Sequence, residues 1–231
     1  MPEPWRVHTI VFDLDDTLIA ERDYVLSGFA AVDTWIQLNL MRSGFGTTAV
    51  DLFTGGKRGK IFDEAIDLMG LSGDASLVPR LIDIYRNHEP KIRLLPDAKA
   101  ALEWARNNVD LGLISDGWLT CQERKVRALE LNQVIPEIIL TDRWGREGWK
   151  PALRAFLSIM QTMHGRNADG FVYVGDNPLK DFSAPRRLGW RTIRIRRTGG
   201  EHFAREAIGA DAADREIPTL FQLPELVSAA H

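Results

Sequence analysis

The sequence predicts an α/β protein with a parallel sheet, helices on both faces of that sheet and one helical insertion. Two observations predict this class. Short apolar runs that end in polar or small residues alternate with helical patterns along most of the chain, and such alternation is typical of a parallel sheet covered on both sides. One long segment, from Arg22 to about Pro90, has helical patterns without convincing strands. We therefore expect a core that contains the sheet and a separate helical region.

The expected strands are short. The pattern predicts that the first four are buried and that each has polar side chains at its end. They are Val7 to Asp13, Val109 to Ser115, Glu137 to Asp142 and Phe171 to Asp176, and a fifth is Arg191 to Arg196. The expected helices between them have about three turns each, a typical length. They are Asp97 to Asn107, Cys121 to Leu131, Pro151 to His164 and Lys180 to Leu188, and a further helix-like stretch is Thr219 to Ser228.

The composition describes an ordinary folded protein and argues against several functional classes. The chain has 231 residues, of which 45% are hydrophobic and 26% charged, and its formal charge of -3 argues against a general nucleic-acid binder. The basic patch Arg194 to Arg197 is interpreted as the outer face of an alternating strand. No run approaches a membrane span, the first residues do not resemble a leader, and the single cysteine, Cys121, suits a reducing compartment. We expect a soluble, cytoplasmic protein with no nucleic-acid or membrane partner, and the oligomeric state stays open.

The first expected strand runs directly into a crowded group of aspartates, Asp13, Asp15 and Asp16, followed by Thr17. Adjacent carboxylates repel one another, so the group indicates a positive charge among them. If the strand stays extended, Asp13 and Asp15 point the same way and can share a ligand. Two carboxylates are also the usual minimum for Mg²⁺, which takes further oxygen atoms from a substrate phosphate. The alternative is a solvated acidic turn that caps the following helix.

Two more polar tracts follow later strands. Ser115, Asp116 and Gly117 end the second strand, where a hydroxyl and free backbone N–H groups can bind an anion, although an ordinary helix cap is the alternative. Lysine is scarce, with 7 lysines among the 29 basic residues. Lys150 precedes Pro151, which suits the first turn of a helix. There Lys150 is either a cation for a developing phosphoryl charge or a solvated surface residue.

The fourth tract, GDNPLKD, follows the strand that begins at Phe171. Gly175 permits a tight turn, and Asp176 can face the ion already placed near Asp13. Asp181 is expected in the next helical turn, beside Lys180. A helix cap is the alternative, but it explains a second aspartate less well.

Together, DLDDT, SDG, KP and GDNPLKD resemble the four signature motifs of the haloacid dehalogenase-like (HAD) hydrolase superfamily, in its phosphatase branch with a helical cap inserted after the first motif. The resemblance covers Val7 to Arg196. It implies a Rossmann-like core of residues 1–20 and 91–231 and a helical cap of residues 21–90. It also implies a Mg²⁺-dependent phosphatase that hydrolyses a small phosphate monoester, such as a sugar phosphate or a nucleotide, through an aspartyl-phosphate. The alternatives are a phosphomutase of the same fold and a non-catalytic binding protein that retains it.

The resemblance also implies roles for individual residues. Asp13 would be the nucleophile, and Asp15 would be the general acid and then the base. Ser115 and the backbone N–H groups of Asp116 and Gly117 would bind the phosphoryl oxygens, and Lys150 would neutralise their charge. The Asp13 side chain, the Asp15 carbonyl and Asp176 would hold Mg²⁺, with Asp181 and Thr17 in support and with Asp181 either near the metal or bonded to Lys150.

The sequence departs from family relatives at two positions, and its helical cap contains candidates for substrate specificity. Asp116 stands where many relatives have asparagine, which we expect to be mild because the backbone N–H is the contact. The family's dehalogenases lack the aspartate that Asp15 supplies, so its presence favours phosphoryl transfer. Within the cap, the candidates for substrate specificity are basic residues of the TGGKRGK segment and two residues at the cap entrance: Lys57, Arg58, Lys60, Arg22 and Tyr24.

Overall fold

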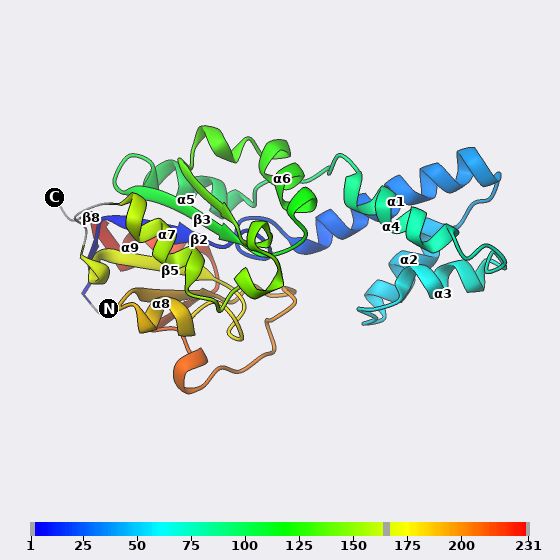
Figure 1. The fold of residues 1–231 in the computed structure, drawn as a ribbon. Helices are drawn as coiled ribbons and strands as arrows, with labels where there is room; N and C mark the ends of the chain where they lie inside the picture. Colours follow the sequence, from blue (N-terminus) through cyan, green and yellow to red (C-terminus); the bar gives the residue numbers. More distant parts are fainter. Residues whose placement is uncertain (1–2, 164–166, 230–231) are drawn as a thin grey trace. The chain divides into compact units, whose positions relative to one another are not determined.

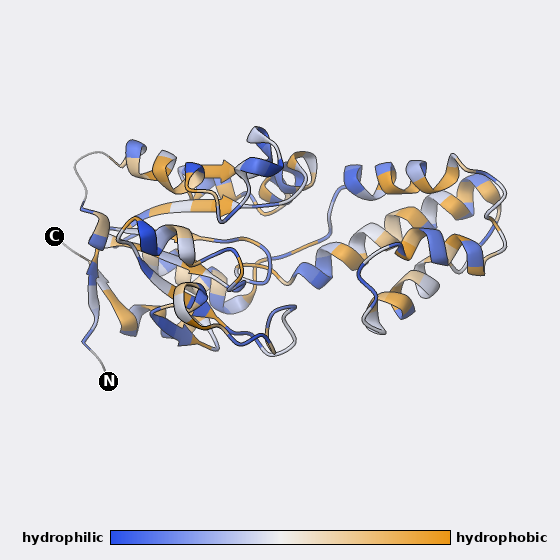
Figure 2. Cartoon of the chain, turned by 60° about the horizontal axis from the view of Figure 1, so that its bottom comes forward, coloured by the Kyte–Doolittle hydropathy of each residue, from blue (hydrophilic) through white to orange (hydrophobic). Residues whose placement is uncertain are grey.

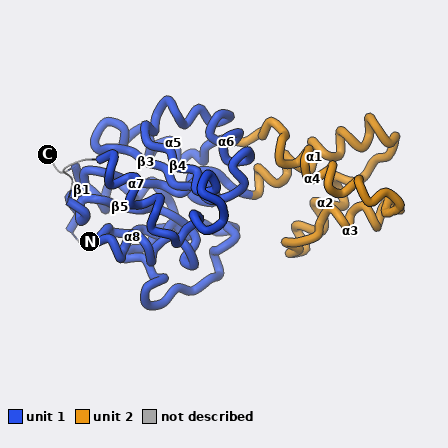
Figure 3. The backbone as a smooth tube through the Cα atoms, in the orientation of Figure 1, with its two compact units in different colours: residues 1–21, 93–231 blue, residues 22–92 orange. Residues whose placement is uncertain are grey.

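The computed structural model describes residues 3–163 and 167–229, and the chain forms two compact units (Figures 1 and 3). Unit 1 comprises residues 1–21 and 93–231, and unit 2 comprises residues 22–92. Each unit has its own hydrophobic core.

Unit 1 is built on a parallel sheet that, within the described residues, has six strands in the order β4-β3-β2-β5-β6-β7 (Figure 1). The strands are β2 (Thr9–Phe12), β3 (Asp110–Ser115), β4 (Glu137–Leu140), β5 (Phe171–Gly175), β6 (Arg191–Ile195) and β7 (Arg215–Ile217). Every neighbouring pair is parallel, and the register places Val11 of β2 between Gly112 and Tyr173. The α/β class and the Rossmann-like core are therefore confirmed.

Two short strands at the chain ends form a second, parallel pair, β1 (Trp5–Val7) and β8 (Val227–Ala229). The first predicted strand is thus divided at His8, whose N–H donates to the carbonyl of Gly170 at 2.9 Å. The helix predicted over Thr219 to Ser228 is wrong in most of its length. The segment consists of a 3-10 turn, the one-turn helix α9 (Leu223–Leu226) and β8.

Besides α9, the described residues of unit 1 form four helices. They are α5 (Pro96–Ala105), α6 (Leu119–Ala128), α7 (Arg154–Thr162) and α8 (Ser183–Arg187). Helix α7 packs on β3 and β4, and α8 packs on β6. Two predicted helix starts are wrong, because α7 begins after Pro151 and α8 begins after Asp181. The predicted end of the first of these, His164, lies outside the described residues.

Strand β6 corrects our interpretation of the basic patch. It lies between β5 and β7, and Arg194 is 0% exposed and therefore does not lie on an outer face. Its guanidinium donates to the backbone carbonyls of Asp176 at 3.3 Å, His202 at 2.8 Å and Arg205 at 2.8 Å. Because carbonyl oxygens supply these acceptors, a buried cation is tolerated in this strand.

Unit 2 is helical. Its elements are α1 (Glu21–Leu40), α2 (Phe45–Thr54), α3 (Ile61–Leu68) and α4 (Leu77–Asn87). Phe29 lies at the centre of its core, with edge-to-face ring contacts to Phe45 and Phe62. In Figure 2 these helices carry alternating hydrophobic and hydrophilic bands, as expected for helices with one buried side. Among the described helices, no helix combines the length and the apolar character that crossing a membrane requires.

Candidate active site

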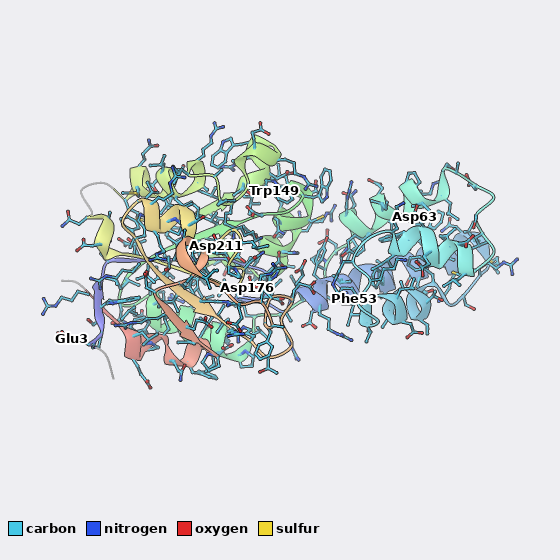
Figure 4. All side chains as sticks on the ribbon, turned by 90° about the horizontal axis from the view of Figure 1, so that it is seen from below. Glu3, Phe53, Asp63, Trp149, Asp176 and Asp211 are labelled. Carbon is cyan, nitrogen blue, oxygen red and sulfur yellow. The ribbon has the colours of Figure 1, made fainter. Side chains whose placement is uncertain are left out.

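The carboxyl ends of three neighbouring strands of unit 1 bring the predicted polar residues together. Asp13 follows β2, Ser115 ends β3, and Asp176, which Figure 4 labels, follows β5. Strand β2 pairs with both β3 and β5. The Asp13 N–H extends this pairing by donating to the carbonyl of Val174 at 2.8 Å. In parallel α/β sheets, ligands bind at this edge, so the location suits a site for chemistry.

Lys150 lies at the centre of the site, with a side chain that is 0% exposed. Its ammonium donates to the carboxylate of Asp13 at 2.6 Å and to the hydroxyl of Tyr173 at 2.8 Å, and it pairs with Asp181 at 2.8 Å. Burial alone would lower the pKa of Lys150, but the two carboxylates raise it well above its usual value. Lys150 is therefore a buried, charged residue. The alternative, a solvated surface lysine, is wrong.

Tyr173 is a part of this site that sequence reasoning missed. It lies within β5, where an apolar run gives no polar signal, and its ring packs edge-to-face on Phe156. The two-residue period of a strand places its side chain on the same face as Gly175. Its hydroxyl fills a position beside Lys150 that an aliphatic side chain would leave without a hydrogen-bonding partner.

Three aspartates of the site could hold a metal ion. The carboxylate oxygens of Asp13, Asp176 and Asp181 lie within 4.8 Å of one another, and all three residues are buried. Both oxygens of Asp181 are already engaged, one with Lys150 and the other with the N–H of Asn177 at 2.8 Å. Of the two positions considered for Asp181, the structure thus shows the bond to Lys150.

Gly175 makes the approach of Asp181 possible. A Cβ atom at this glycine would lie 2.5 Å from the Asp181 carboxylate. Asp181 itself lies in the turn before α8 rather than in a helix. The glycine is therefore required for close backbone approach, as the sequence pattern predicts.

Among the described residues, no cation lies at hydrogen-bonding distance from the Asp176 carboxylate. Within the part of the chain that the structure describes, its carboxylate makes no hydrogen bond or ion pair. Burial, together with the Asp181 and Asp13 carboxylates, raises the pKa of Asp176 to about 9. Burial also raises the pKa of Asp13 to about 6, against the opposing effect of Lys150. A cluster of oxygen donors with this excess of negative charge fits a hard divalent cation such as Mg²⁺.

The carboxylate of Asp15 has partners of its own, which sequence reasoning missed. Lys125 of α6 pairs with both of its oxygens, at 2.7 Å and 2.8 Å, and the amide of Gln122 donates to one of them at 3.0 Å. Strand β2 ends at Phe12, so the two-residue period does not extend to Asp15. The expectation that the Asp13 and Asp15 side chains share one ligand is therefore not met.

The loop after β3 is shaped around Gln122. Ser115 donates from its hydroxyl to the Gln122 side-chain oxygen at 3.2 Å. Gly117 has a φ of +128°, and a Cβ atom there would lie 2.5 Å from the Gln122 amide nitrogen. Only glycine satisfies both conditions, so the residue is needed for backbone conformation and for space.

Asp116, the departure from the more common asparagine, has a structural function in this loop. Its carboxylate accepts from the Thr141 hydroxyl at 2.7 Å and from the backbone N–H of Lys150 at 3.1 Å. Burial alone would raise its pKa, but Lys150 and Lys180 lower it below the usual value. An ionised Asp116 therefore ties the loop after β3 to the loop that carries Lys150.

Asp16 and Thr17 connect the first motif to neighbouring segments. Asp16 has a φ of 52°, and its carboxylate accepts from the N–H of Glu21 at 2.9 Å and of Glu201 at 2.8 Å. The carbonyl of Thr17 accepts from Arg197 at 2.8 Å. Asp16 is thus a residue that orders the backbone of this loop.

The candidates for substrate specificity make local contacts within unit 2. Lys57 pairs with Glu64, and Arg58 donates to the carbonyl of Phe53 at 2.8 Å, with its guanidinium 4.3 Å from the centre of the Phe53 ring, which Figure 4 labels. An open groove of about 730 Å³ in unit 2 is lined by residues that include Lys57 and Lys60. Tyr24 is buried and has ring contacts with Tyr85 and His88, whereas Arg22 is exposed.

Comparison with known proteins gives consistent results. A family model described as haloacid dehalogenase-like hydrolase matches residues 10–195. Glyceraldehyde 3-phosphate phosphatase from Methanocaldococcus jannaschii is 29% identical over 198 residues, which cover 80% of this chain and 83% of that protein.

Solved structures with low sequence identity share the fold. The magnesium-bound HAD-hydrolase YfnB from Bacillus subtilis has a TM-score of 0.68 at 16% identity, over 96% of this chain and 99% of that chain. 2-Haloacid dehalogenase from Pseudomonas syringae has a TM-score of 0.64 at 20% identity, over 95% of this chain and 97% of that chain. These two proteins differ in name while sharing the fold, so the choice between reactions depends on the residues of the site.

Proposed function

Because the chain belongs to the haloacid dehalogenase-like hydrolase family, we propose that it is a Mg²⁺-dependent phosphatase that hydrolyses a small phosphate monoester. The observation that carries the proposal is the buried pair of Asp13 and Lys150, at 2.6 Å, with a second carboxylate, Asp15, two residues after the first. Asp15 favours phosphoryl transfer because carbon–halogen cleavage does not need an acid for the leaving group. The name of the relative from Methanocaldococcus jannaschii supports a phosphatase and, within the monoesters, a small sugar phosphate.

In the first half of the proposed reaction, Asp13 attacks the phosphorus atom of the substrate. A bond forms between an Asp13 oxygen and phosphorus, and the bond from phosphorus to the alkoxide oxygen breaks. Asp15 donates its proton to that oxygen, so the alcohol leaves neutral. Lys150 holds the other side of the Asp13 carboxylate and offsets negative charge on the transferring group.

In the second half, a water molecule attacks the phosphorus atom of the aspartyl-phosphate on Asp13. Asp15, now ionised, takes the proton of this water, and the bond between phosphorus and the Asp13 oxygen breaks to release phosphate. The Ser115 hydroxyl and the N–H groups of Asp116 and Gly117 bind the phosphoryl oxygens throughout. These donors lie on one short loop, and the Ser115 hydroxyl, which donates to Gln122 in the structure, would turn its O–H to the phosphoryl group.

Mg²⁺ would be held by the side chains of Asp13 and Asp176 and by the carbonyl oxygen of Asp15. When bound, it supplies positive charge that offsets the carboxylates and the phosphoryl group. The raised pKa of Asp176, about 9, supports this assignment, because an uncompensated carboxyl is otherwise costly there.

The proposal is tested by phosphate release from a panel of phosphorylated metabolites, with Mg²⁺ and with a chelator. We expect turnover of small monoesters with Mg²⁺ and loss of turnover with the chelator. Equal phosphate release under both conditions would contradict dependence on Mg²⁺. Release of halide from 2-haloacids without any phosphatase activity would contradict the proposed reaction class.

Asp176→Asn should stabilise the metal-free protein and remove most of its stabilisation by Mg²⁺. A carboxyl whose pKa is raised on folding contributes its full stability below its unfolded pKa and loses it as pH rises through the folded pKa, here about 9. The free energy of unfolding of the variant should therefore exceed that of the parent by an amount that grows between about pH 4 and 9. This difference should reach ~1–3 kcal/mol. Thermal unfolding with chelator and with Mg²⁺ measures both effects, and the exposed Asp169→Asn is the control. A variant that is less stable than the parent without metal at pH 8 would contradict the account.

A role of unit 2 in substrate specificity predicts a change in KM. Replacing Lys57 and Arg58 together by alanine should raise KM for the best substrate of the panel more than for a small aryl phosphate, with kcat unchanged, because contacts outside the reacting group act on binding. The exposed Lys91→Ala, also in unit 2, is the control. Unchanged kinetics on both substrates would show that Lys57 and Arg58 serve only their local contacts with Glu64 and Phe53. Arg22 would then be the next candidate for substrate specificity.

A further inference from the structure

Helix α6 presents two buried polar side chains to the site, and the proposed reaction does not use them. Gln122 and Lys125 are each 3% exposed, although lysine is almost never fully buried without a partner. They are three residues apart and therefore lie on one face of the helix. The buried face of α6 thus consists partly of polar residues, which costs stability unless each of them is satisfied.

Both side chains converge on the carboxylate of Asp15. Lys125 reaches its two oxygens at 2.7 Å and 2.8 Å, and the Gln122 amide reaches one of them at 3.0 Å. Three contacts on two oxygens fix both the position and the plane of a carboxylate. The Asp15 side chain is itself 18% exposed, so it keeps access to reactants while its geometry is held from α6.

Gln122 also connects Asp15 to the expected phosphate-binding loop. The Gln122 side-chain oxygen accepts from the Ser115 hydroxyl at 3.2 Å, while its nitrogen donates to Asp15. One amide therefore contacts both the hydroxyl proposed to bind phosphate and the carboxylate that must reach the leaving oxygen. Gly117 provides the space for this amide, since a Cβ atom there would collide with it.

We propose that Gln122 and Lys125 are positioning residues that hold the Asp15 carboxylate in reach of the leaving-group oxygen. This inference rests on the proposed function, in which Asp15 transfers the proton. A displacement of about 1 Å in a reacting group can cost about 10²-fold in rate, so two residues that touch no substrate still affect turnover. Lys125 is distinct from Lys150, because it contacts Asp15 rather than Asp13.

The test is a double-variant cycle between Lys125→Met and Asp15→Asn. The substrates are 4-nitrophenyl phosphate, whose leaving group needs little protonation, and phenyl phosphate, whose leaving group needs more. Lys125→Met should lower the rate of the phosphorylation step, measured as release of the leaving group in the first turnover, by about 10–100-fold for phenyl phosphate, the range for residues that orient a catalytic group, and should affect 4-nitrophenyl phosphate far less. KM should stay unchanged for both. The same substitution in the Asp15→Asn background should have no further effect, because the carboxylate that Lys125 positions is absent there.

Controls separate this inference from a structural effect and from the proposed function. The exposed Lys99→Met should behave as the parent, and Lys125→Arg should recover part of the rate. If Lys125→Met does not fold, Gln122→Met is used in the same cycle with the same expectation. A rise in KM, an equal loss on both substrates or an additive double variant would overturn the positioning role. If Asp15→Asn itself shows no dependence on the leaving group, the assigned role of Asp15 fails, and the positioning role fails with it.

Discussion

Asp13→Asn is expected to abolish phosphate release while leaving the fold intact. The amide keeps the shape of the carboxylate but removes the nucleophile and one charge of the candidate metal site, and loss of a nucleophile typically costs more than about 10⁴-fold in kcat. Lys150 keeps two of its partners, Asp181 and the Tyr173 hydroxyl, so its burial stays compensated. Steady-state phosphate release from 4-nitrophenyl phosphate with Mg²⁺ measures the loss.

Two comparisons make this result specific. Asp169→Asn, an exposed substitution of the same kind in unit 1, should retain the activity of the parent. The circular dichroism spectrum of Asp13→Asn should match that of the parent, which separates loss of chemistry from loss of fold. Activity of Asp13→Asn within about tenfold of the parent would remove Asp13 from the nucleophile position.

Asp15→Asn is expected to lose about 10²–10⁴-fold in kcat on alkyl phosphates, the usual range for a general acid and base. The loss on aryl phosphates with good leaving groups should be smaller in the first step, because those groups leave without protonation. The second step still needs a base, so the phosphorylated enzyme should accumulate during turnover of the aryl substrate. Equal loss on alkyl and aryl substrates, with no accumulation, would show that Asp15 is not the proton-transfer residue.

The sequence predicts the fold because its main signals are local. The buried strands β3 and β5 are short apolar runs bounded by polar residues, and each lies where the pattern predicts it. The motif residues are predictable for the same reason, since Ser115 ends a strand and Asp13 and Asp176 each follow one directly. Parallel strands then place these ends side by side without further information.

The partners of these residues are harder to predict, because their signals are tertiary. Lys125 and Gln122 lie on the buried face of α6, and only the packing of that helix tells them apart from solvated polar residues. A glutamine and a lysine three residues apart just after the SDG tract were the available signal. The alternating pattern around Arg194 fits a half-exposed strand, whereas its side chain is buried and contacts a segment that follows the strand in the sequence. The polar surroundings of Arg194 come from carbonyl groups of residues 202 and 205, which no side-chain pattern reveals.

Turnover is expected to proceed through a phosphoryl group on Asp13, which acid quenching during turnover would capture. The protein would be mixed with a good substrate and Mg²⁺, quenched in acid within the first turnover, digested and analysed by mass spectrometry. We expect a phosphoryl group on the peptide that contains Asp13, at a higher level in Asp15→Asn and absent in Asp13→Asn. Rapid phosphate release with no phosphorylated peptide in either the parent or Asp15→Asn, or a phosphoryl group on another residue, would contradict this expectation.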